Sequence, residues 1–452
     1  MENKTVLYLT KYYLSTRVAA GIRADRFVSA LVQKGYRVVV VTKGEKAYIE
    51  NRSPLLQICC INAEDRLPAE ISQESLPKWP SWKRLPGPDA EYGFSRAVYR
   101  AAQWLIRRFP VDALFATAGP YGLMAIAHTL AGQYHLPMVL EFRDAWFTGM
   151  EWPYRSYLEK RQARLWEKRC ILDAQAVITE TETQRQILVE TYGESLGQKI
   201  ETIRHSYEAV AEKGGGIPPK PDRPFMIAYT GQLRGIDRMS APVLARVLLR
   251  ASRLIRRGLF GACFCEKLRL DWMSPHYLLQ ALAGAAQDDP EFGRSFQMHF
   301  VGNRFPAVDH WAKKMGIAEQ VIQHGPLPHS QVKEYLTEVD LLVLSLYGIK
   351  NRDYHWCVPG KTYTYLGSGK AILALLPPGE ARDLVLQAGT GFPARPDDIP
   401  GIQKTVLDLF RKIKFEGFQP RPNWDFIRQF HLPVQQNRFV QIISSVIRGR
   451  DG

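Results

Sequence analysis

Short apolar runs alternate with amphipathic segments of helix length along most of the chain. The first such runs lie at 6–10, 37–42, 111–117, 137–142 and 176–179, and they consist mainly of Val, Ile, Leu, Ala and Phe. Runs of this length and composition are typical of strands buried on both faces of a sheet. Because segments of helical period separate most of them, we predict an α/β fold with a parallel sheet.

The same rhythm starts again after a stretch rich in Gly and Pro. This stretch, Gly214 to Pro221, combines three glycines with three prolines, which is typical of a linker. We therefore predict a first domain at 1–210, a linker at 211–222 and a second domain at 223–422. A segment at about 239–272 interrupts the second domain, and we expect the final helix, at about 433–448, to pack back on the first.

One unit of the second domain predicts an anion site. The apolar run 341–345 is followed by Pro359 and Gly360, by a short helical segment that begins with Lys361, and by the apolar run 371–376. In a parallel strand–helix–strand unit, the free N–H groups of the helix start lie beyond the strand end. With a lysine in the first turn, this position suits a phosphate.

Other candidate ligand residues also follow predicted strands. Gly21 would allow close approach of a ligand to the backbone, but its loop has no GxGxxG pattern, which excludes a dinucleotide fingerprint. Gly231 and Arg234 lie in the turn after the strand at 225–229. Arg143 and Asp144 follow the strand at 137–142; the alternative for this pair is an ion pair that only holds a loop.

Composition narrows the class of protein. The chain has 452 residues, 46% hydrophobic and 23% charged, which is typical of a soluble globular protein of two domains. The sequence contains no run of about 18 apolar residues, so we predict no membrane-spanning helix. The first residues are typical of a strand rather than of a signal peptide. The net charge of +15 fits a nucleic acid, an anionic membrane or a nucleotide as the partner.

Two local features leave alternatives open. Cys263 and Cys265 have a spacing that a metal could use, but unpaired thiols are favoured for all six cysteines. In the segment 243–257, one helical stripe carries Arg246, Arg250, Arg253 and Arg257. This basic amphipathic helix predicts either attachment to an anionic bilayer or, more simply, a surface helix packed on its own domain.

Several segments together resemble a known family, the retaining glycosyltransferases of GT-B fold, of the large family-four type of bacterial sugar transferases. The resemblance covers nearly the whole chain in the same order. The segments are FRDAW at 142–146, YTGQLRGIDR at 229–238, HFVGN at 299–303, HGPLPH at 324–329, VDLLVLS at 339–345 and VPGKTYTYLGSGKAILAL at 358–375.

The resemblance implies two Rossmann-like domains with parallel sheets that face each other across a cleft. The first would bind the acceptor and the second a nucleoside diphosphate sugar, with no metal and no other cofactor. The residues that match the family's donor site are Gly231 and Arg234 at the diphosphate, Lys361 at the helix start, Leu327 beside the nucleobase, Thr364 and Tyr365 on the ribose helix, and Gly21 near the phosphates.

The ribose helix departs from the family pattern. Members usually carry a glutamate where this chain has Thr364, and a second one where it has Trp356. A hydroxyl still bonds a ribose but loses a charge-assisted bond of about 1–3 kcal/mol. Donor binding would then be weakened, rearranged or lost, unless Glu380 substitutes from the next loop.

The catalytic assignment follows the same resemblance. Such enzymes lack an agreed protein nucleophile, and the acceptor hydroxyl attacks on the face from which the diphosphate leaves. We predict that Asp144 positions or deprotonates the acceptor and that Arg143 orients it; His128, His205 and His324 are alternatives.

The leading hypothesis is a hexosyltransferase-type enzyme of polysaccharide biosynthesis, located in the cytoplasm, either free or peripheral on the inner membrane. It would transfer a sugar to a glycan or lipid-linked acceptor. The alternatives are a sugar-nucleotide epimerase of the same fold and a binding protein without transferase activity. Nucleic-acid binding is disfavoured because the basic residues are dispersed.

Overall fold

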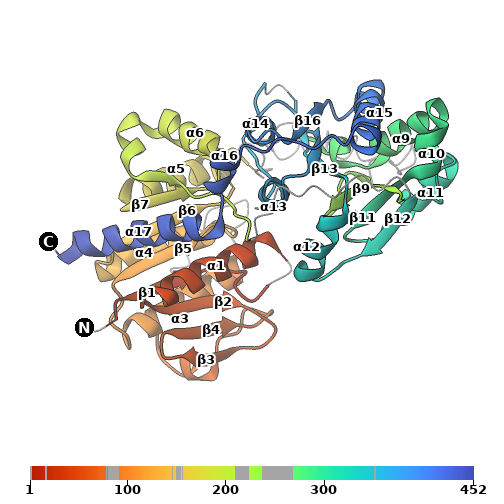
Figure 1. The fold of residues 1–452 in the computed structure, drawn as a ribbon. Coiled ribbons are helices and arrows are strands. Elements are labelled where there is room, and N and C mark those ends of the chain that lie inside the picture. The colour runs from red at the N-terminus through yellow and green to blue at the C-terminus, as the bar shows by residue number, and fades with distance from the viewer. Residues whose placement is uncertain are drawn as a thin grey trace. The chain divides into compact units, whose positions relative to one another are not determined.

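Two separate sets of strands form the frame of the molecule (Figure 1). The computed structural model describes residues 3–15, 18–77, 79, 91–144, 146–148, 154, 156–208, 223–236, 268–350 and 353–451. Described residues up to His205 and from Pro433 onward form unit 1, and those between Ser206 and Leu432 form unit 2. The basic segment 243–257 and Cys263 and Cys265 lie outside the described residues.

The apolar runs of the first half become a sheet of order β3-β4-β2-β1-β5-β6-β7-β8 in unit 1. All neighbours are parallel except β3 and β4, which form an antiparallel pair at one edge. The strands are β1 (Thr5–Leu9), β2 (Arg37–Lys43), β3 (Tyr48–Ser53), β4 (Leu56–Ile61), β5 (Ala113–Thr117), β6 (Met138–Phe142), β7 (Ala176–Thr179) and β8 (Ile200–Thr202).

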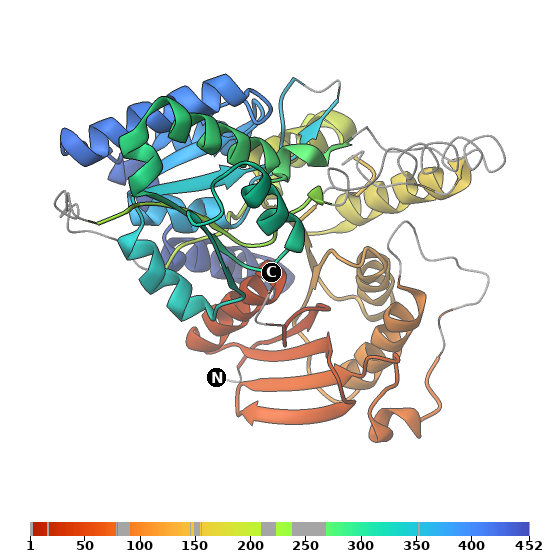
Figure 2. The same cartoon turned by 90° about the vertical axis from the view of Figure 1, so that its right-hand side faces the viewer.

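Helices cover both faces of this sheet. One face packs on α1 (Ala19–Gln33), which Figure 2 shows in red along the first strands, and on α17 (Leu432–Asp451). The rings of Phe27 and Phe439 stack there with centroids 4.0 Å apart, so the last helix completes this core. The other face packs on α3 (Tyr92–Ile106), α4 (Gly122–Tyr134), α5 (Tyr157–Asp173) and α6 (Glu182–Tyr192), and α2 (Ala69–Ser72) and η1 (Glu194–Gln198) are short helical turns.

Unit 2 repeats the doubly wound plan with the strand order β12-β11-β9-β13-β15-β16, all parallel. Its strands are β9 (Phe225–Thr230), β11 (Phe296–Val301), β12 (Val321–Gly325), β13 (Leu341–Ser345), β15 (Ala371–Leu375) and β16 (Gly391–Ala394), and β10 (Leu268–Arg269) pairs separately with β14 (Gly348–Ile349). The described residues thus confirm the predicted α/β class with two parallel-sheet domains.

The helices of unit 2 also divide between two faces. One face carries α9 (His276–Asp288), α10 (Pro290–Ser295), α11 (Pro306–Lys314) and α15 (Ile399–Phe415). The other carries α12 (His329–Glu338), α13 (Lys361–Ser368), α14 (Glu380–Gln387) and α16 (Trp424–Arg428), and η2 (Leu270–Met273) is a short turn.

Two helix starts illustrate how local chemistry sets the element ends. Thr181 caps α6, as its position before a helical pattern predicts, and its hydroxyl accepts a hydrogen bond from Gln184 N at 3.2 Å. The second, α12, begins at His329 directly after Pro328, and Ser330 lies inside its first turn rather than at the cap. Proline before the first helical residue fixes the extended conformation that a cap needs.

Candidate functional site

The sheet of unit 2 has one point where the chain reverses its direction of winding. From β9 the chain proceeds outward through β11 to β12, and it then returns to place β13 on the other side of β9. The loops after β9 and β13 diverge at this point, and open α/β sheets bind ligands there, outside the carboxyl ends of the strands. Gly231 and Arg234 follow β9, and Lys361 begins the helix after β13.

Lys361 joins the two sides of this switch point. Its ammonium group donates a hydrogen bond to Thr230 O at 3.0 Å and lies 3.5 Å from the centre of the Tyr229 ring. Burial lowers the pKa of Lys361 well below its usual value, and no carboxylate of the described residues pairs with it. Lys361 is half-buried, and partial desolvation of an ammonium without a counter-anion is unfavourable, so this group is suited to hold an incoming anion.

The loop after β9 approaches the neighbouring loop at backbone distance. Gly231 has a φ of +108°, and its N–H donates to Val301 O at 2.8 Å. A Cβ on Gly302 would lie 2.1 Å from Gly231 O. Both glycines are therefore needed for the loops to pass. Arg234 is exposed, and its charge lowers the pKa of Tyr229, although burial raises that pKa overall.

Two members of α13 that the resemblance assigns to the ribose have different environments. Tyr365 is fully buried, and its hydroxyl bonds both the N–H and the hydroxyl of Thr230 at 3.0 Å. It therefore positions the end of β9 from within the core. Thr364 is half-buried. Earlier in the same segment, Trp356 Nε1 and Thr362 Oγ1 are buried atoms without a hydrogen-bond partner in the described structure.

The predicted nucleobase segment contains a histidine pair. His299 Nδ1 and His324 Nε2 lie 2.9 Å apart, on β11 and the end of β12. Burial lowers the pKa of His299 to about 4 and also lowers that of His324, so the neutral forms are favoured at pH 7. Leu327 follows in the turn before α12 and is half-buried. Glu380 is the first residue of α14, and its backbone N–H donates to His355 O at 3.0 Å.

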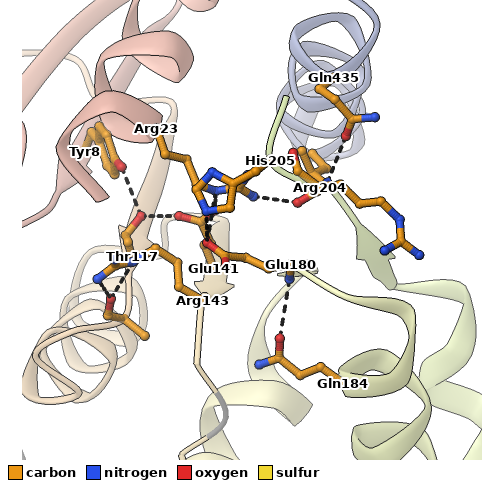
Figure 3. Close-up of polar contacts among 12 residues, drawn as sticks. Tyr8, Arg23, Thr117, Glu141, Arg143, Glu180, Gln184, Arg204, His205 and Gln435 are labelled. Carbon is orange, nitrogen blue, oxygen red and sulfur yellow. Dashed lines mark hydrogen bonds and ion pairs between the residues drawn. The ribbon is translucent and has the colours of Figure 1, made fainter. Parts of the chain in front are cut away.

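Unit 1 has its own switch point, between β1 and β5, and a buried polar network lies beside it (Figure 3). Tyr8 of β1 and Thr117 of β5 bond through their hydroxyls at 3.0 Å. Thr117 also donates to Glu141 Oε2 at 2.6 Å, which links β5 to β6. The hydroxyl chain therefore ends on a carboxylate.

Arg23 of α1 is the cation of this network. Its Nε lies 2.6 Å from Glu141 Oε1, and the side chains are 4% and 1% exposed. The other guanidinium nitrogens donate to Ile203 O at 2.7 Å and Arg204 O at 3.1 Å, at the end of β8. One buried arginine thus connects α1, β6 and β8, and its satisfied donors make the buried ion pair tolerable.

Glu180, after β7, carries a second negative charge in the same place. Its Oε1 lies 3.2 Å from His205 Nε2 and 3.6 Å from Arg23 Nε. Burial alone would raise the pKa of Glu180, but His205, Arg23 and Arg143 outweigh it and hold the pKa at about 2. Glu180 is therefore ionised at neutral pH and available to orient the His205 ring.

The predicted catalytic pair lies at the same edge of the sheet. Arg143 donates to Ala118 O at 2.7 and 3.1 Å, and its guanidinium lies 5.3 Å from the centre of the Tyr12 ring. Asp144 is exposed, and its backbone carbonyl accepts from Tyr121 OH at 3.2 Å. An exposed carboxylate beside a fixed guanidinium is compatible with the acceptor role that the resemblance implies.

Two other predicted residues have local explanations. His128 Nε2 lies 2.7 Å from Asp173 Oδ2, and its ring packs edge-on against Trp166, so it joins α4 to α5. Gly21 does permit a close backbone approach, but to the chain's own loop: a Cβ there would lie 1.9 Å from Ser15 O. A glycine is needed at position 21 because the loop after β1 packs closely on the start of α1.

The sequence analysis did not identify Arg23, Glu141 or Glu180 as site residues. Glu141 is the one charged residue within the apolar run 137–142, and a charge in a strand buried on both faces requires a partner. That pattern could have drawn attention to Glu141. Its partner is 118 positions away in sequence, and only the fold brings the two together.

Comparison with known families finds a match within unit 1. Residues 19–203 match the model of the glycosyl transferase 4-like domain. A comparison with curated protein sequences finds no match. The network of Arg23, Glu141 and Glu180 lies within this domain.

Solved structures match the whole chain in fold. Sucrose-phosphate synthase from Thermosynechococcus elongatus is 12% identical with a TM-score of 0.64, over 99% of this chain and 100% of that one. Anabaena HepE in complex with UDP-glucose is 11% identical with a TM-score of 0.58, over 98% and 99%. The likeness shows the predicted GT-B fold.

An epimerase also shares the fold at a lower similarity. UDP-GlcNAc 2-epimerase from Methanocaldococcus jannaschii is 10% identical with a TM-score of 0.50, over 98% of this chain and 99% of that one. Fold alone does not distinguish the reactions, since one fold hosts several activities.

Proposed function

We propose that the protein is a glycosyltransferase that moves a sugar from a nucleoside diphosphate sugar to a glycan or lipid-linked acceptor, with retention of configuration and without a metal. The observation that carries the proposal is Lys361, a half-buried lysine at the switch point of unit 2 whose ammonium group has a carbonyl and an aromatic ring as its neighbours. The diphosphate of the donor would supply the missing negative charge.

The family domain in unit 1 supports transfer rather than binding alone. In the proposed reaction, the bond between the anomeric carbon and the diphosphate oxygen breaks, and its electron pair remains on the diphosphate. The acceptor oxygen bonds to that carbon on the same face and loses its proton. Lys361 and Arg234 would stabilise the leaving charge.

Unit 1 offers two groups for the acceptor proton. Asp144, with Arg143 as its orienting neighbour, is the group that the resemblance implies. His205 is the second, because the carboxylate of Glu180 lies 3.2 Å from its Nε2. Comparing Asp144→Asn with His205→Gln in a transfer assay separates them: the variant that lowers kcat most, at unchanged donor affinity, identifies the group.

Thermal unfolding in the presence of UDP-, GDP- and dTDP-sugars tests the donor site. At least one nucleotide sugar should raise the Tm of the wild type, and Lys361→Ala and Arg234→Ala should reduce that shift. Lys313→Ala, an exposed lysine on α11, is the matched control. If no nucleotide sugar stabilises the wild type, the proposal is wrong.

Product analysis separates the alternatives. A transferase releases free nucleoside diphosphate only when an acceptor is supplied, whereas an epimerase converts one nucleotide sugar into another. The epimerase of similar fold favours the second possibility, and Thr364 in place of the family's glutamate favours a binding protein without turnover. If a nucleotide sugar binds but neither free nucleoside diphosphate nor a converted nucleotide sugar is formed, the protein is a binding protein without turnover.

A further inference from the structure

A stripe of leucines lies on the solvent side of α5 rather than on its buried side. Leu158, Leu165 and Leu172 are 56%, 45% and 44% exposed, and Tyr157 at the helix start is 72% exposed. Single exposed leucines are common on protein surfaces, but here three recur at intervals of seven. At 1.5 Å per residue the stripe is about 21 Å long.

The helical repeat places these leucines at the centre of the exposed surface. At about 100° per residue, the three lie within about 40° of one another. Ala163, Trp166 and Cys170 lie on the opposite side and are buried in the core of unit 1. The helix therefore has two apolar sides, and only one of them is covered.

Basic side chains border the leucine stripe. Arg161, Arg164 and Lys168 lie along one side of it and Arg169 along the other, and all four are exposed. Arg164 lies 5.5 Å from the centre of the Phe147 ring, whereas Arg161 and Lys168 have no ion-pair partner among the described residues. The one exposed acid of the helix, Asp173, is at its far end beside His128. The surface is apolar in the middle and cationic at its sides.

We propose that this face of α5 docks on an anionic lipid bilayer, with the leucines and Tyr157 among the acyl chains and the arginines and lysines at the headgroups. An apolar stripe flanked by cations is the arrangement that lies in the plane of such a surface. The guanidinium and ammonium groups reach the headgroup level by extending their alkyl chains. A second copy of the chain is a poorer occupant, because Arg161 and Lys168 of two packed helices would repel each other.

Vesicle flotation tests the docking without using the proposed reaction. The full chain should float with vesicles of 70% phosphatidylcholine and 30% phosphatidylglycerol but not with phosphatidylcholine alone, and 0.5 M NaCl should reduce the bound fraction. Leu158→Gln/Leu165→Gln/Leu172→Gln should lose binding at least 10-fold at low salt. Arg161→Gln/Lys168→Gln should lose it about 30-fold, since each cation near an anionic surface changes the binding constant about 5-fold.

Matched variants control for fold and for net charge. Leu386→Gln replaces a leucine that is 43% exposed on α14, and Lys313→Gln/Lys314→Gln removes two exposed cations from α11. Both controls should float as the wild type does, and all variants should keep its circular dichroism and Tm. Wild-type protein that does not float, or leucine variants that float equally well, would overturn the proposal. Self-association that depends on the three leucines in light scattering would assign the face to a second copy instead.

Discussion

The ammonium group of Lys361 donates to the backbone carbonyl of Thr230 at 3.0 Å, which joins the start of α13 to the end of β9. One hydrogen bond thus spans the switch point of the sheet in unit 2. The backbone N–H of the same residue, Thr230, donates to the hydroxyl of Tyr365. Two residues of α13, Lys361 and Tyr365, therefore contact the end of β9.

Replacing Lys361 by methionine should separate binding from stability. Loss of a charge-assisted contact should weaken binding of UDP or of the preferred nucleotide about 10- to 100-fold in calorimetry. The free energy of unfolding in urea should stay constant or rise by up to about 1 kcal/mol, because a half-buried unpaired charge is removed. Strong destabilisation with unchanged nucleotide affinity would contradict an anion-binding role.

Introducing the family's glutamate at Thr364 should strengthen donor binding. If α13 holds the donor ribose, Thr364→Glu restores a charge-assisted hydrogen bond of about 1–3 kcal/mol, which corresponds to a Kd lower by about 5- to 150-fold. Thr364→Gln, with the same shape and no charge, is the control and should change the Kd less. Equal Kd values for all three proteins would show that the ribose lies elsewhere.

The ion pair of Arg23 and Glu141 should be revealed by a double-mutant cycle. Glu141→Gln leaves the buried guanidinium without its nearest carboxylate, and we expect a loss of about 3 kcal/mol in the free energy of unfolding. The double variant Arg23→Met/Glu141→Gln should lose much less than the sum of the losses of Arg23→Met and Glu141→Gln. Additive losses in urea unfolding would mean that the two charges do not stabilise each other.

Glu167 should make stability fall as the pH rises. Burial raises its pKa to about 7, despite hydrogen bonds from Tyr192 OH, Phe147 N and Thr148 N. Because the folded-state pKa exceeds the unfolded value of 4.5, the stabilisation is complete below pH 4.5 and is lost as the pH rises through 7.

Comparison with Glu167→Gln isolates this effect. Between pH 5 and pH 7 the wild type should lose about 2 kcal/mol more in the free energy of unfolding than the variant does. Histidines and other groups titrate in both proteins, so their contributions cancel in the difference. Parallel stability curves for the two proteins would show that Glu167 has an ordinary pKa.

Gly21 and Gly132 form a matched pair of helical glycines. Gly21→Ala should destabilise unit 1 by about 2–4 kcal/mol, since the new Cβ would lie 1.9 Å from Ser15 O. Gly132→Ala in α4 meets nothing within 4 Å and should stabilise by up to about 1 kcal/mol. Urea unfolding at one pH measures both, and similar effects of the two substitutions would refute the close packing of the loop on α1.

The sequence predicts the strands that are apolar throughout and fails where burial is one-sided. β7 and β13 were predicted at their observed bounds because every residue in them is buried. β3 was not predicted, since it is an edge strand whose sequence YIENRS is largely exposed. β3 is a strand because it pairs with β4, and its amino-acid composition alone does not predict this pairing.

The candidate site divides in the same way. The place of Lys361 as the first residue of a helix could be predicted, because Pro359 and Gly360 precede a helical pattern in sequence. The environments of Gly21 and Tyr365 could not, because Ser15 O and Thr230 approach them only in the folded chain. Residues that bind each other over long separations, as Arg23 and Glu141 do, need the fold to be recognised.

The stacking of Phe439 on Phe27 has a consequence for the order in which the protein can mature. Phe27 and Phe439 are more than 400 residues apart in sequence, so during translation the part of this face that α17 covers stays exposed long after α1 has been made. Unit 2 is inserted within unit 1 in sequence, and a fragment that ends at residue 205 would leave that part of the apolar face uncovered. Because exposed apolar surface promotes aggregation, we expect such a fragment to aggregate and the full chain to depend on chaperones during translation.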